Sequence, residues 1–140
     1  MINDSSNENQ FRNVVAQDAV LDTLVRTMRV DQRMGMAMGM SGGASTSWRI
    51  LMRHPKNFAG ILMMGFAGCE FGDLAPHTRI AFLYGNDDFN ARHVRRCVPR
   101  LEQAGYTVWA VEFVGGHEPG QPELRDPMLD WLLEGARQRV

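Results

Sequence analysis

The chain has 140 residues and a mass of 15.8 kDa, a length at which a protein forms one domain with its own core. Hydrophobic residues make up 44% of it and charged residues 22%, with a formal net charge of -1. Because there is no positive excess to attract phosphate backbones or anionic lipid, we expect neither a nucleic-acid partner nor a membrane partner.

The N-terminal decapeptide MINDSSNENQ is polar and rich in Asn and Ser, which predicts a tail over residues 1–10 and one domain over residues 11–140. It has neither the basic nor the apolar region of a secretion signal, and no segment reaches the roughly 18 apolar residues of a membrane span. We therefore expect a cytoplasmic protein. Cys69 and Cys97 lack C-x-x-C spacing and a histidine at ligand spacing, so no metal site is expected.

An amphipathic helix is predicted directly after the tail, from Phe11 to the segment VDQR. Its apolar residues recur at helical intervals, with charged residues on the other faces. They are Val14, Val15, Ala19, Leu21, Leu24, Val25 and Met28.

The next stretch, RMGMAMGM, alternates methionine with glycine and alanine, which predicts a short strand over residues 34–40. One side carries Met34, Met36, Met38 and Met40, and the small residues form the other side. We expect a core strand in which methionine fills irregular space. A methionine metal site is less favoured, because it needs a wet and convergent arrangement.

The remaining chain alternates between helix and strand patterns. ASTSWRILMR predicts a helix that ends before Pro55, and residues 59–65 and 79–85 are apolar runs typical of strands buried on both faces. FNARHVRRCVPRLEQAG predicts a helix that ends at Gly105 and is kinked or restarted at Pro99. YTVWAVEFV predicts a fourth strand, and a closing helix follows with Leu124, Met128, Trp131 and Leu132 on one face.

This order predicts an α/β fold: a parallel sheet of about four strands with helices on both faces. In such sheets the reactive groups gather at the carboxyl ends of the strands.

A nucleophile-elbow motif, G-x-S-x-G, joins the first strand to the next helix as Gly39-Met40-Ser41-Gly42-Gly43. The turn holds the serine backbone in a strained conformation, so the positions two before and two after it must lack bulky side chains. Here both are elbow glycines, Gly39 and Gly43. The amide of Gly42 and the following helix N-terminus would face an oxyanion at Ser41. Ser41 is thus a candidate nucleophile and Gly42 a candidate oxyanion-hole donor.

A serine nucleophile needs a base, and the base needs an orienting carboxylate. LYGNDDFN places Asp87 and Asp88 after the third strand, where either is also a suitable turn or helix-capping residue. FVGGHEPG sets His117 in a glycine-flanked loop after the fourth strand. A surface histidine without a catalytic role is an equally good interpretation of this position. The chain order Ser, Asp, His is that of the α/β-hydrolase triad.

From about Phe11 onward the chain resembles the C-terminal half of an α/β hydrolase, of the esterase or dienelactone-hydrolase-like kind. The similar segments are GMSGG, RHPKNFAGILMMGFAG, LYGNDDFN and GGHEPG. The family's spacing of glycine, two variable residues and then the acid selects Asp88 over Asp87. The resemblance implies that Ser41 is the nucleophile, His117 the general base and Asp88 the orienting acid of a carboxylesterase-like serine hydrolase. Its partner would be a small-molecule ester, and it would need no cofactor and no metal.

The family's N-terminal half, which supplies strands before the elbow and a second oxyanion amide, has no counterpart in this sequence. Strand 34–40 would then be a sheet edge with unpaired amides and an apolar methionine surface. We therefore expect a homodimer through this edge, cover by the N-terminal segment, or a longer gene product. The alternative function is a catalytically weak or inactive hydrolase-derived fragment that binds or assembles. A nucleotide-binding module is less favoured, because Lys56 is misplaced for a phosphate loop.

Overall fold

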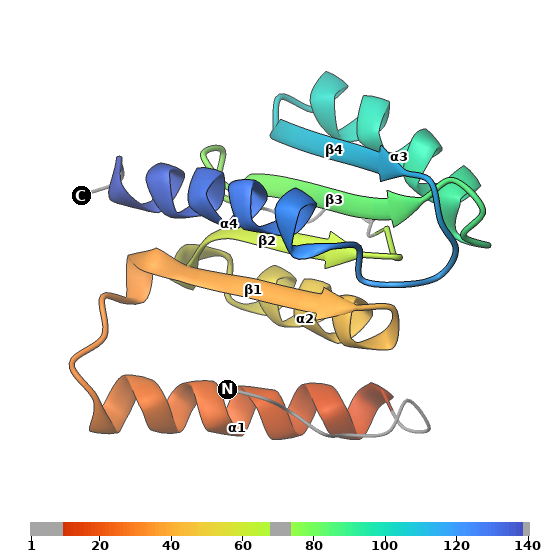
Figure 1. Ribbon diagram of the computed structural model, residues 1–140. Helices are drawn as coiled ribbons and strands as arrows, with labels where there is room; N and C mark the ends of the chain where they lie inside the picture. Colours follow the sequence, from red (N-terminus) through yellow and green to blue (C-terminus); the bar gives the residue numbers. More distant parts are fainter. Residues whose placement is uncertain (1–9, 68–73, 139–140) are drawn as a thin grey trace.

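The computed structural model describes residues 10–67 and 74–138 and contains four strands and four α-helices in these ranges (Figure 1). The strands are β1 (Gly35–Met40), β2 (Phe58–Met64), β3 (Arg79–Gly85) and β4 (Thr107–Phe113). The helices are α1 (Gln10–Thr27), α2 (Gly42–Arg53), α3 (Ala91–Gln103) and α4 (Pro122–Arg137). Two 3₁₀ turns, η2 (Gln32–Met34) and η3 (Pro55–Asn57), precede β1 and β2.

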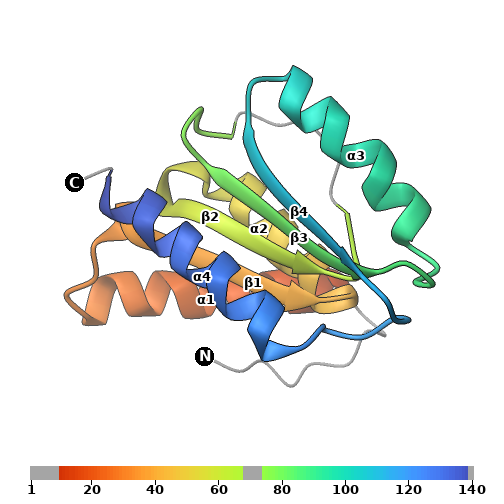
Figure 2. The same ribbon diagram turned by 45° about the horizontal axis from the view of Figure 1, so that its top comes forward.

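The four strands form one parallel sheet in the order β1-β2-β3-β4, with helices on both faces, so the predicted α/β fold is confirmed (Figures 1 and 2). Alternate residues of β2 and β3 belong to two separate cores. Ile61, Met63 and Phe82 pack with α2 and α3 on one face. Leu62 and Leu83 pack with α4 on the other face. This double burial explains why both strands read as continuous apolar runs.

The expectation that β1 is a core strand is wrong for two of its methionines. β1 begins at Gly35, and Met34 lies in η2. Ala37 is buried against the α2 side, but Met36 and Met38 point to the other face and are 36% and 52% exposed. The reason is that β1 is an edge strand, and α4 packs mainly on β2 and β3.

The first helix is covered less than its sequence pattern predicts. α1 begins at Gln10, one residue before the expected start of the domain; residues 1–9 of the predicted tail lie outside the described residues. The helix packs against α2 through Val14, and Leu21 joins the same core, whereas Val15, Ala19 and Met28 are exposed. α1 therefore contributes a narrow apolar stripe.

The third helix is continuous through Pro99, so of the two predicted alternatives, a kink or a restart, the restart does not occur. α3 runs from Ala91 to Gln103 with Pro99 inside it.

Cys97, on the buried face of this helix, is not a free thiol, and Cys69 lies outside the described residues. Over residues 10–67 and 74–138, no helix is both long enough and apolar enough to cross a membrane.

Candidate active site

The three candidate catalytic side chains lie where three parallel strands end. Ser41 follows β1, Asp88 follows β3 within the turn before α3, and His117 belongs to the loop after β4. The structure brings two of them into direct contact, since Nδ1 of His117 lies 2.8 Å from Oδ2 of Asp88. Because parallel strands share their carboxyl edge, residues far apart in the chain meet there.

Ser41 has the strained backbone of a sharp strand-to-helix turn. Its φ of 52° and ψ of -119° make it the one non-glycine residue with positive φ in the described ranges. The Ser41 amide donates to the carbonyl of Met64 at 2.8 Å, which ties the turn to the end of β2. Ser41 occupies the N-cap position of α2, yet its hydroxyl makes no capping hydrogen bond. An unfavourable backbone conformation is thus retained without using the hydroxyl for helix stability.

The two elbow glycines are not equivalent. A Cβ on Gly39 would lie 2.4 Å from the carbonyl carbon of Gly43 and 2.5 Å from the amide nitrogen of Ala44. Gly39 is therefore required by the close approach of α2 to β1. A Cβ on Gly43 would meet nothing within 4 Å. A methyl group at Gly43 would therefore fit, whereas one at Gly39 would not.

Gly42, the candidate oxyanion donor, is the first residue of α2. Amides in the first turn of a helix have no partner within the helix, and the helix dipole places partial positive charge there. This position lets the Gly42 N–H face an anion formed at Ser41.

The carboxylate of Asp88 is fully buried, and both of its oxygens are occupied. Oδ1 accepts from the amide of Asn90 at 2.7 Å, and Oδ2 faces His117. The Asn90 side chain in turn donates to the carbonyl of Gly65 at 2.8 Å. A buried carboxylate must be paired to be tolerated, so this network fixes its orientation. Asp87 is exposed, and its amide donates to the carbonyl of Gly115 at 3.0 Å.

The histidine loop is held against the end of β3. Asn86 donates its amide to the carbonyl of Phe113 at 2.8 Å and accepts at Oδ1 from the amide of Gly115 at 3.0 Å. A Cβ on Gly85 would lie 2.2 Å from the carbonyl oxygen of Gly115, so the loop rests directly on that glycine. The loop thus crosses from β4 over β3 and carries His117 toward β2.

Gly65, directly after β2, lies beneath the imidazole and was not singled out from the sequence. It has a φ of 56°, and a Cβ on it would be 2.9 Å from both Asp88 Oδ2 and Met40 Cε, and 3.1 Å from His117 Cε1. Met40 pairs with Met64, so Ser41 and Gly65 directly follow paired residues of two adjacent strands. The imidazole therefore lies at the end of the strand next to the serine. A glycine ending a buried apolar run was the available signal.

Phe89 is a second residue that sequence reasoning missed. Its ring centroid lies 4.2 Å from that of His117, with the planes tilted by 34°. The side chain is 76% exposed although it is large and apolar. It covers one face of an imidazole that is itself 26% exposed.

An ionic cluster lies next to the segments that carry Asp88 and His117. Nε of Arg95 on α3 lies 2.8 Å from Oε2 of Glu112 on β4. The hydrogen bond from Arg95 lowers the pKa of Glu112. Burial raises the pKa of the neighbouring Tyr84, and its hydrogen bond to Glu112 adds to that rise. The cluster joins α3 to β4 next to the acid and histidine segments.

Solved structures with the same fold include several esterases. The Bacillus cereus carboxylesterase matches with a TM-score of 0.70 at 18% identity, over 93% of this chain and 63% of that chain. A variant of Arabidopsis thaliana SOBER1 matches with a TM-score of 0.63 at 21% identity, over 99% of this chain and 67% of that chain. A thermostable esterase matches with a TM-score of 0.69 at 21% identity, over 88% of this chain and 36% of that chain.

The chain therefore has the α/β-hydrolase fold found in esterases, and the predicted fold resemblance is confirmed. It spans about two thirds or less of the length of these structural relatives. A scan of protein-family models and a search of curated protein sequences gave no match.

Proposed function

We propose that this chain is a serine hydrolase that cleaves an ester of a small substrate through an acyl-enzyme. The observation that carries the proposal is the 2.8 Å contact between His117 and the fully buried Asp88, in a loop that brings the imidazole over the strand next to Ser41. The strained backbone of Ser41 and its uncommitted hydroxyl support the same role. The esterase fold of the structural relatives is consistent with it.

In this mechanism the Nδ1–H of His117 donates to Asp88, which leaves Nε2 to take the proton of the Ser41 hydroxyl. The Ser41 Oγ forms a bond to the ester carbonyl carbon, and the Gly42 amide binds the resulting oxyanion. When the bond to the alcohol oxygen breaks, His117 returns the proton to that leaving oxygen. Water then attacks the acyl-serine with His117 again as base, the bond between the acyl carbon and Oγ breaks, and His117 returns the proton to Oγ as the carboxylic acid leaves. Asp88 holds the tautomer and stabilises the imidazolium.

The test is covalent labelling with a fluorophosphonate probe. Wild-type protein should be labelled, Ser41→Ala should not, and His117→Ala should suppress labelling. The adjacent acids form a matched pair: Asp88→Asn should slow ester hydrolysis by roughly 10³- to 10⁴-fold, whereas Asp87→Asn should leave it near wild type. Circular dichroism of each variant establishes that it is folded.

A second function, a hydrolase-derived binding or assembly module, is favoured by one observation. The edge strand β1 exposes Met36 and Met38, a surface suited to contact. Folded wild-type protein that takes up no probe would support this function and contradict the hydrolase. Equal loss of hydrolysis in the two aspartate variants would show that the acid assignment is wrong.

A further inference from the structure

Phe89 is an apolar side chain whose backbone is held in place although the side chain is not buried. Its neighbour Asp88 is buried, and the amide of Asn90 donates to Oδ1 of Asp88 at 2.7 Å. The Asn90 side chain donates to the carbonyl of Gly65 at 2.8 Å, so the chain is anchored on both sides of Phe89. Yet Phe89 is 76% exposed and belongs to neither hydrophobic core of the residues that the structure describes. Core packing therefore does not explain this phenylalanine.

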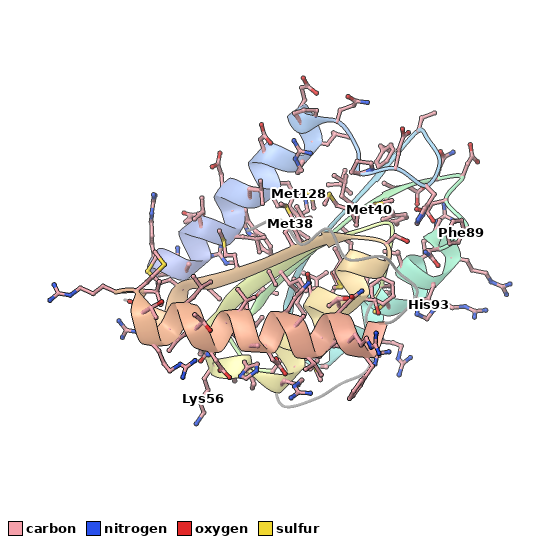
Figure 3. The ribbon with its side chains drawn as sticks, turned by 90° about the horizontal axis from the view of Figure 1, so that it is seen from below. Met38, Met40, Lys56, Phe89, His93 and Met128 are labelled. Carbon is pink, nitrogen blue, oxygen red and sulfur yellow. The ribbon has the colours of Figure 1, made fainter. Side chains whose placement is uncertain are left out.

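The position of Phe89 does not depend on the open edge of the sheet. Phe89 follows β3, which has a strand on either side, and it lies where α3 begins. Figure 3 shows it well apart from Met38 of the edge strand β1. The ring that it contacts, His117, belongs to the loop after β4, which is at the other end of the strand order from β1. The pair of rings therefore lies on the β3 and β4 side of the candidate site.

The proposed mechanism places the alcohol part of an ester beside this pair of rings. Nδ1 of His117 faces Asp88, so Nε2 is the atom that returns a proton to the leaving oxygen. Proton transfer needs that oxygen at about 3 Å from Nε2. Because the two ring centres are 4.2 Å apart, the oxygen then lies roughly 6 Å from the centre of the Phe89 ring. Aromatic rings pair at about 4.5–7 Å, so a ring attached to the leaving oxygen comes within reach of Phe89.

We propose that Phe89 determines specificity by binding the alcohol part of the substrate, and that this alcohol carries an aromatic ring. This inference rests on the proposed hydrolase function. An exposed aromatic side chain next to the imidazole favours a flat apolar group, because aromatic pairs are stabilised beyond the area that they bury. The contact with His117 leaves most of Phe89 exposed, so a substrate ring can pack on it without displacing the histidine.

The test compares hydrolysis of benzyl acetate and methyl acetate. The two alcohols are of similar acidity, and both esters give the same acetyl-enzyme, so the ratio of their kcat/KM values reports contacts to the alcohol. A phenyl ring covered on one face by an aromatic side chain should contribute roughly tenfold. We therefore expect kcat/KM of wild-type protein to be about tenfold higher for benzyl acetate, and Phe89→Ala to lower this ratio to about two.

Three further variants separate the aromatic ring from other effects. Phe89→Tyr keeps the aromatic face and should keep the wild-type ratio. Phe89→Leu keeps apolar area without a ring and should lower the ratio about threefold. The matched control is Phe11→Ala, because Phe11 on α1 is 75% exposed, as much as Phe89; its ratio should equal that of wild type.

A wild-type ratio near one, or an unchanged ratio in Phe89→Ala, would overturn the assignment of Phe89 and leave the hydrolase in place. A residue that only holds the imidazole would give the second of these results, with both esters slowed by the same factor. Failure of the proposed function is recognised separately, because Ser41 then takes up no fluorophosphonate probe.

Binding measured by NMR tests Phe89 if the proposed function fails or if neither ester is hydrolysed. The ring Cε1–H signal of His117 is assigned by its absence from His117→Ala. Benzyl alcohol, and not methanol, should shift this signal in wild-type protein, and the shift should be lost in Phe89→Ala. An unshifted signal, or an equal shift in the two proteins, would overturn the proposal.

Discussion

On the histidine side of the candidate site, side-chain hydrogen bonds hold each group, whereas on the elbow side the geometry is set mainly by backbone contacts. Asp88 is fixed by Asn90 and His117, and the loop is fixed by Asn86 and by its packing on Gly85. Ser41 is held by backbone hydrogen bonds to Met64 and from Ser45, and by α2 passing close to Gly39. Side-chain hydrogen bonds therefore position the acid and the histidine, and backbone contacts position the serine.

The difference arises from where each segment goes after its strand ends. Asp88 follows the interior strand β3, and His117 follows β4, whose loop packs back over the end of β3 and so finds polar partners there. Among the residues that the structure describes, β1 has a strand neighbour on one edge only, and Met36 and Met38 are exposed. We therefore expect one added methyl group to disrupt the elbow. On the histidine side, we expect single substitutions to have smaller effects on stability and labelling.

The largest effect is expected for Gly39→Ala, on the elbow side. Its methyl group would lie 2.4 and 2.5 Å from backbone atoms, far inside van der Waals contact, and backbone cannot rotate away as a side chain can. We expect stability to fall by about 3 kcal/mol or more and probe labelling to be lost. Urea denaturation and fluorophosphonate labelling measure the two effects.

Gly43→Ala is the matched control within the same motif. It adds the same methyl group two residues after Ser41, into open space at the start of α2. Because alanine is a better helix former than glycine, we expect stability unchanged or raised by up to about 1 kcal/mol, with labelling retained. Similar losses in both variants would contradict the asymmetry of the elbow.

The second-largest effect is expected for Gly65→Ala. Gly65 lies against Met40 of the elbow side and against Asp88 and His117 of the histidine side. The new methyl group would meet Asp88, Met40 and His117, and the residue has a positive φ that disfavours alanine. Those neighbours are side chains and can move, so we expect a smaller stability loss of about 1–3 kcal/mol. Displacing the imidazole by ~1 Å should slow ester hydrolysis on the order of 100-fold.

Gly105→Ala is the control that shows how much of the Gly65→Ala effect comes from the positive φ alone, without contact to neighbouring side chains. Gly105 has a φ of 88°, and a Cβ there would meet nothing within 4 Å. We expect a loss of about 1 kcal/mol from strain and unchanged hydrolysis. If Gly65→Ala hydrolyses esters as fast as Gly105→Ala does, the imidazole does not depend on the space above Gly65.

The sequence was informative wherever a residue's role follows from its place at a strand end. The pattern of apolar runs predicted the strands, and the parallel order then implied that residues after β1, β3 and β4 share one edge. The contact between Asp88 and His117 is consistent with that inference. Their catalytic roles remain predictions that the labelling experiment addresses.

What could not be predicted depends on tertiary contacts. Gly65 and Asn90 have no motif of their own, and they matter because loops from distant parts of the chain cross at Gly65. Alternation along β1 correctly separated the methionines from Ala37, but it cannot say whether a helix covers either face. The difference between Gly39 and Gly43 could not be predicted, because the motif gives the same residue at both positions, whereas the space around each depends on how α2 leaves the turn.

The smallest effect is expected for Glu112→Gln, which removes one support of the histidine side. Arg95 and Glu112 are both partly exposed, so the pair is screened by water and salt, and we expect the melting temperature to fall by only about 2 °C at pH 7, with labelling unchanged. Because the folded pKa of Glu112 is lowered from 4.5, the pair stabilises the protein above the unfolded pKa, and this contribution is lost as the pH falls through the folded value.

The difference in melting temperature between wild type and Glu112→Gln should therefore disappear on acidification below about pH 4.5, and should shrink in 1 M salt at pH 7. Glu102→Gln, an exposed position on α3, corrects for the loss of one negative charge. A large loss of labelling in Glu112→Gln, absent from Glu102→Gln, would mean that the histidine loop depends on one ion pair. In that case the histidine side would be as sensitive to a single change as the elbow.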